Sequence, residues 1–244
     1  MPISARPART IQRSRVVVSG VLVALLAALI AAGRITGDQI IGYVATVASL
    51  MLAGQVASMV TRRQVAPAER TLVPGASSRI DPLGTLIVPA LLDVGLLGFF
   101  GWLRPLPSLP AQRGGRNALV LRALSSSATY LSVMITAAVI FRIAYHGEDV
   151  SSVSLISRIA FLTGFVNTWL LVTSLIPAPP LPGSVLLERI LPVSAWARYA
   201  RIRPHVAKGI VGFLLISVML GLGTVSFFAQ LIERLWLWLL LIGS

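Results

Sequence analysis

Long apolar runs dominate this sequence and decide what kind of structure it can form. Five of them approach or exceed the roughly 20 residues that a helix needs to cross a bilayer. They are residues 16–33, 40–60, 119–145, 159–176 and 209–230. Backbone polar groups must pair internally in lipid, so only helices or closed barrels can span it. Because the runs lack the alternation of barrel strands, the sequence predicts an all-α polytopic membrane protein with about five transmembrane helices.

A sixth apolar run, residues 83–103, is interrupted by helix-breaking residues such as Pro89 and Gly95. If all six runs crossed the membrane, the 21 Lys and Arg residues would divide eleven to ten between its two faces. If the sixth run instead enters and returns to the same face, they divide seventeen to four. Basic residues accumulate on the cytoplasmic side, so the second arrangement is preferred. We therefore expect a re-entrant hairpin of two half-helices over residues 83–103.

The remaining organisation follows from charge and composition. Residues 1–15 are basic and are expected to be cytoplasmic, which makes residues 16–244 a single membrane domain in the plasma (inner) membrane. Residues 231–243 contain two tryptophans and are expected to form an interfacial helix. The net charge of +13 favours contact with anionic lipid headgroups. Nucleic-acid binding is not expected, because no basic face is interleaved with aromatic residues.

Several short motifs occur in a characteristic order. They are Arg62-Arg63 at the end of the second run, IDPLGT at 80–85, FGWLRPLP at 100–107, NTWLLVTSLIPAPPLPGS at 167–184 and RYARIRPH at 198–205. Between about residues 40 and 215, this order resembles the site-2 protease family of intramembrane zinc metalloproteases. The resemblance implies a similar membrane core, in which two His, one Asp and a Glu base would form a zinc site that cleaves membrane-embedded peptides.

The residues that the resemblance assigns to that zinc site are changed in this chain. The HExxH positions of the family correspond to Ala53, Gly54 and Ala57, and the third metal ligand corresponds to Pro182. These side chains can neither bind zinc nor accept a proton. A register shifted by two residues is no better, since it places Gln55, Val56 and Met59 there. We therefore expect no metal, no cofactor and no peptidase activity, as in a pseudoprotease.

A second group of residues is the candidate lining of the former substrate cleft. Its members are Asp93, Ser126, Thr129, Asn167, Ser174, Pro177, Pro179, Pro180 and Gly183. Asp93 is an ionisable residue inside an apolar run, where such residues are usually functional. It could instead cap a half-helix or pair with Arg122. The prolines could simply shape the turn, and Asp81 could act as a helix N-cap.

These features favour a non-catalytic scaffold or accessory subunit that binds a membrane-protein partner or joins a larger membrane complex. Two alternatives stay open. One is an intramembrane peptidase with an unrecognised active site, which the absence of cysteine and of any histidine in a span makes harder to build. The other is a small-solute channel or transporter, for which the re-entrant hairpin is the main argument.

Overall fold

In a computed structural model, the protein is all-helical over the residues that the structure describes, and no strand occurs among them. The described residues are 36–94, 98–104, 115–145, 153–179, 181–185, 190–195 and 223–241, with short pieces between 198 and 213. The predicted N-terminal segment 1–15 and span 16–33 lie outside them, as do most of residues 209–222.

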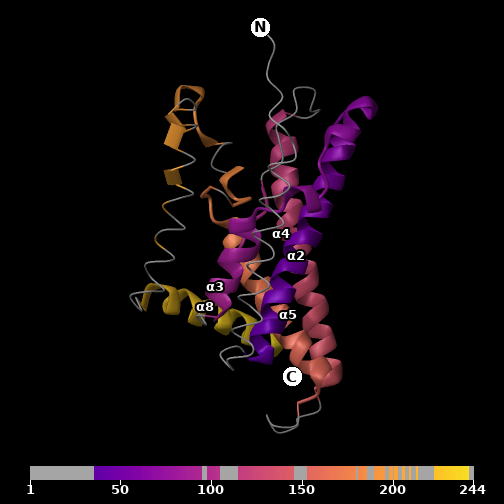
Figure 1. The fold of residues 1–244 in the computed structure, drawn as a ribbon, viewed down its shortest axis with the longest axis vertical. Coiled ribbons are helices and arrows are strands. Elements are labelled where there is room, and N and C mark those ends of the chain that lie inside the picture. Colours follow the sequence, from indigo (N-terminus) through magenta and orange to yellow (C-terminus); the bar gives the residue numbers. More distant parts are fainter. Residues whose placement is uncertain are drawn as a thin grey trace.

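Five α-helices form the framework of the described part of the molecule (Figure 1). They are α2 (Gly37–Gln64), α3 (Val88–Val94), α4 (Gly115–Ala144), α5 (Leu155–Leu175) and α8 (Gly223–Leu241). Shorter turns cover Pro67–Leu72, Ser77–Arg79 and Val193–Ala195, and a π-helical turn covers Pro82–Ile87. Within the described residues, three helices are long and apolar enough to cross a membrane: α2, α5 and residues Val120–Ala144 of α4. The all-helical class is thus confirmed for the described residues, whereas five spans with a re-entrant segment stay a prediction.

The starts of α2 and α5 are set by hydroxyl caps. Thr36 and Gln39 form a capping box, in which the Thr36 hydroxyl accepts from the Gln39 N–H and the Gln39 side chain accepts from the Thr36 N–H. At α5, the Ser154 hydroxyl accepts from the Ser157 N–H. Both helices therefore begin a few residues before the apolar runs from which they were predicted.

Helices α2, α4 and α5 pack together as the central bundle. The Arg158 guanidinium pairs with the Asp38 carboxylate, which brings the starts of α5 and α2 to the same end. The hydroxyls of Ser127, early in α4, and Ser174, at the end of α5, hydrogen-bond at 2.8 Å, so α4 runs antiparallel to α5. The bundle core is apolar and is made of Leu50, Ala53, Phe99, Tyr130, Val166, Trp169, Leu170 and Ile232.

Residues 79–104 form a hairpin against this bundle. The π-helical turn and α3 descend along α2, and the chain then returns so that the Arg104 N–H donates to the Arg79 carbonyl at 2.8 Å. The first leg is helical as predicted, but the predicted second half-helix is wrong over residues 98–104, which have no helical or other regular structure. Gly98 has a φ of 116°, a conformation that few residues other than glycine adopt, and it cannot continue a right-handed helix.

Helix α8 crosses the bundle instead of running along it (Figure 1). Its Trp236 is fully buried where Gly164 of α5 leaves room, since a Cβ on that glycine would overlap the indole. The Arg142 side chain at the end of α4 donates to the Leu240 carbonyl. Helix α8 is continuous across residue 231, where the sequence predicted the boundary between a span and an interfacial helix. Its interfacial placement stays a prediction.

Candidate functional site

The positions that the family resemblance assigns to a metal face the hairpin, and protein atoms fill the space beside them. Ala53 and Ala57 are buried on α2. A Cβ on Gly54 would overlap the Leu103 side chain from the returning leg of the hairpin. None of these residues offers an oxygen, nitrogen or sulfur side-chain donor, and Pro182 is half-buried in the turn after α5. The residues present therefore do not fit a zinc ion.

A buried cation lies next to the same positions. The Arg79 side chain is only 9% exposed, and its Nη1 donates to the Gly54 carbonyl at 3.2 Å and to the Ser58 hydroxyl at 3.5 Å. Its Nε donates to the Arg104 carbonyl at 2.8 Å. Burial, with the nearby Arg122 charge, lowers the pKa of Arg79 to about 10, so the guanidinium stays charged at neutral pH. A fixed positive charge here repels a metal cation.

The IDPLGT and FGWLRPLP motifs fasten the two legs of the hairpin to each other. Pro89 has no N–H to give to the Gly84 carbonyl in the π-helical pattern, and the Trp102 N–H donates to that carbonyl instead, at 3.0 Å. The Thr85 hydroxyl donates to the Trp102 carbonyl at 2.7 Å. Gly84 is required because the Trp102 indole occupies the place of a Cβ. These motif residues therefore have a structural role.

Asp81 also takes part in the contacts between the two legs of the hairpin. Its carboxylate accepts from the Trp102 indole N–H at 3.0 Å and lies 4.0 Å from the Arg104 guanidinium. It makes no side-chain bond to the helix that follows. Asp81 occupies the predicted N-cap position of the π-helical turn, but its carboxylate makes no capping hydrogen bond there and accepts from the Trp102 indole instead.

Two of the predicted cleft residues, Asn167 and Ser174, form hydrogen bonds between helices and do not line an open cleft. The Asn167 amide is completely buried and donates to the Ser49 hydroxyl of α2 at 2.9 Å. Ser174 bonds to Ser127, a residue that sequence reasoning passed over in favour of its neighbour Ser126. Ser126 is also buried.

Thr129, the other candidate from the start of α4, lies apart from that contact. Its hydroxyl donates to the Ser125 carbonyl one turn earlier in α4, at 2.8 Å. It lines a shallow hollow between α2 and α4, which also includes Leu52 and Val56. The predicted residues are therefore not gathered around one cavity.

The proline turn after α5 is held against the hairpin. Leu181 packs with Trp102 and three other buried residues of the hairpin. Pro177 is exposed and Pro179 is buried. Gly183 has no room for a side chain, because a Cβ would overlap the Ile176 carbonyl. Pro180 lies outside the described residues. The turn, the second half of α2 and the start of α4 thus gather at one end of the molecule.

Asp93 lies towards the opposite end. It is 5% exposed, and its backbone carbonyl accepts from the Gln39 side chain at the start of α2. Its carboxylate is not paired with Arg122 or with any other described residue. It lines a cavity of about 270 Å³ with Phe99, Phe165 and Trp169. Asp93 is therefore not part of the former metal region.

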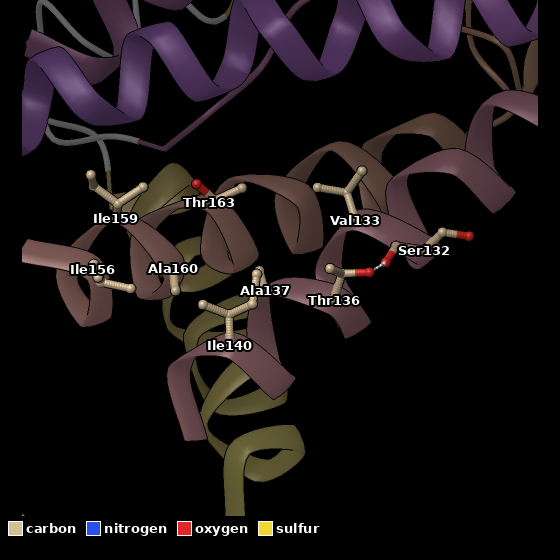
Figure 2. A pocket seen from close by; sticks show the side chains of 9 residues that line it. All are labelled: Ser132, Val133, Thr136, Ala137, Ile140, Ile156, Ile159, Ala160 and Thr163. Carbon is tan, nitrogen blue, oxygen red and sulfur yellow. Dashed lines mark hydrogen bonds between the residues drawn. The ribbon is translucent and has the colours of Figure 1, made fainter. Parts of the chain in front are cut away.

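A separate groove opens between the second half of α4 and the first half of α5 (Figure 2). Its volume is about 470 Å³. Small or hydroxyl-bearing residues form much of its lining, and isoleucines form its edges. The lining residues are Ser132, Val133, Thr136, Ala137, Ile140, Ile156, Ile159, Ala160 and Thr163. No sequence motif singled out this groove.

Comparison with known proteins adds no assignment. No family model, curated protein or solved structure matches the chain. Among the residues that the structure describes, no group of three or more His, Cys, Asp or Glu side chains could hold a metal. The relation to the site-2 protease family therefore stays a hypothesis that rests on the sequence motifs.

Proposed function

We propose that this chain is a catalytically inactive, site-2-protease-like protein of the plasma (inner) membrane, with a cytoplasmic N-terminus, that serves as a scaffold or accessory subunit for a membrane partner. The observation that carries the proposal is the Arg79 guanidinium on the Gly54 carbonyl. This contact places a positive charge beside α2, the helix that would carry metal ligands. The residues at the ligand positions also have no ligand atoms, so both observations support the loss of metal chemistry.

The filling of this region by Leu103 supports the same conclusion. Water-dependent hydrolysis needs a cavity that admits both water and a peptide bond. In this chain, Gly54 faces the Leu103 side chain and Ala57 packs with Val65 and Val73. A packed apolar region at this place stabilises the hairpin but provides neither a nucleophile nor a base.

The groove between α4 and α5 is the surface that we assign to the partner. Lipid is the default neighbour of an apolar helix face, but small residues let another helix approach closely. Ala137 and Ala160 line the groove floor, and Thr136 at its side already donates to the Ser132 carbonyl. Because α4 and α5 are long and apolar enough to span, the partner element that we propose is a transmembrane helix of another protein.

Purification from native membranes in a mild detergent tests both parts of this proposal. We expect a stoichiometric membrane-protein partner in mass spectrometry, no stoichiometric zinc by elemental analysis, and no cleavage of transmembrane peptides. Stoichiometric zinc together with peptide cleavage would overturn the inactive assignment. A chain that purifies alone from several mild detergents would overturn the scaffold assignment.

A further inference from the structure

The cavity at Asp93 has a chemistry that the proposed function does not use. It lies between the start of α2, the end of α3, α5 and α8, at the end of the molecule away from Arg79. Its volume, about 270 Å³, is at the lower limit for small-molecule sites. Three of its walls are aromatic: Phe99, Phe165 and Trp169.

Two polar side chains that line this cavity have no partner among the described residues. The Asp93 carboxylate makes no hydrogen bond or ion pair with any residue that the structure describes. The Trp169 side chain is 6% exposed, and its indole N–H has no acceptor within the described part of the chain. Buried polar groups are normally paired, and an unpaired one needs an explanation such as a missing ligand. Of the two groups, the Asp93 carboxylate is the one that can meet a ligand in the cavity, because the indole nitrogen of Trp169 is inaccessible to solvent.

Asp38, the other acidic residue that lines the cavity, does have a partner. Its carboxylate is paired with the Arg158 guanidinium through both oxygens. Asp38 thus has a cationic partner, whereas Asp93 has none among the described residues. Asp93 packs so closely against α2 that a Cβ on Gly42 would lie 3.0 Å from its Oδ1. The carboxylate is therefore held in place without a cationic partner from the described residues.

We infer that this cavity binds a small organic ammonium group, either on a free amine or on the headgroup of a zwitterionic lipid. The Asp93 carboxylate supplies the counter-charge, and the π-systems of aromatic side chains attract a cation. A metal ion such as sodium prefers several oxygen ligands, and this cavity is mostly aromatic.

Binding of ethanolamine, choline and tetramethylammonium to the full chain tests this inference. Calorimetric titration is done in a maltoside detergent, which contains no ammonium group. Asp93→Asn should weaken binding at least tenfold. Glu233→Gln, the same charge change on the exposed face of α8, should leave it unchanged. Thermal unfolding of each variant establishes that it is folded.

Native mass spectrometry from nanodiscs distinguishes the ligand sources. Retention of phosphatidylethanolamine over phosphatidylglycerol by the parent, but not by Asp93→Asn, identifies a lipid headgroup. Equal binding in parent and Asp93→Asn, or no binding of any of these ligands, would overturn the inference.

Discussion

Replacing Thr85 by valine removes one oxygen from the fully buried contact between the two legs of the hairpin. The Thr85 hydroxyl donates to the Trp102 carbonyl at 2.7 Å and accepts from the Asp81 N–H at 3.1 Å. Both backbone groups lose this partner in Thr85→Val, and each buried group left unpaired costs about 1–3 kcal/mol. The added methyl group recovers about 0.8 kcal/mol. We expect a net loss of about 1–5 kcal/mol in the free energy of unfolding.

Thermal unfolding in detergent measures this loss. At about 2–4 °C per kcal/mol for a chain of this size, the unfolding temperature should fall by about 2–20 °C. Thr136→Val is the matched control, because Thr136 is exposed on α4 and donates only to the Ser132 carbonyl one turn earlier. It should change stability by less than about 0.5 kcal/mol. Equal unfolding temperatures for the two variants would show that the hairpin contact contributes nothing.

Three further substitutions test other contacts of the fold. Gly164→Ala should destabilise the protein by about 1–3 kcal/mol through overpacking against Trp236, whereas Gly37→Ala, with nothing within 4 Å of the new methyl group, should not; chemical denaturation compares them. Ser174→Ala should cost about 1 kcal/mol, because it removes the hydroxyl contact between α4 and α5, and a double-mutant cycle with its partner serine should show coupling. Arg79→Met removes a buried cation with three hydrogen bonds and should increase amide hydrogen exchange in the hairpin; unchanged exchange would contradict its assigned role.

The helical class and three apolar helices were accessible from the sequence, because hydrophobic run length is a direct measure of what a bilayer requires. The helix starts were less accessible. Thr36 and Ser154 cap their helices outside the apolar runs, and a local hydroxyl–backbone bond leaves no trace in hydropathy. Hydropathy also gives no sign of the positive φ of Gly98, which is incompatible with a right-handed helix at that residue.

The candidate site was only partly accessible, for a different reason. Motifs identify residues by position, but they do not say which neighbours compete for them. Asp81 was expected to cap a helix, and the Trp102 indole takes its carboxylate. The motif points to Ser126, but the rotation of α4 about its axis brings the hydroxyl of Ser127 to Ser174. Hydrogen bonds between residues that lie far apart in the sequence cannot be deduced from one sequence without its fold.

Photocrosslinking in living cells tests whether the groove between α4 and α5 holds a partner helix. The photoreactive residue p-benzoylphenylalanine replaces Ala137, which lines the groove, or Val139, which is exposed on α4 but does not line it. A scaffold that binds through the groove should give one discrete crosslinked membrane protein from position 137 and none from position 139. Crosslinks to lipid alone from position 137, with the chain folded and in the membrane, would contradict the proposed function.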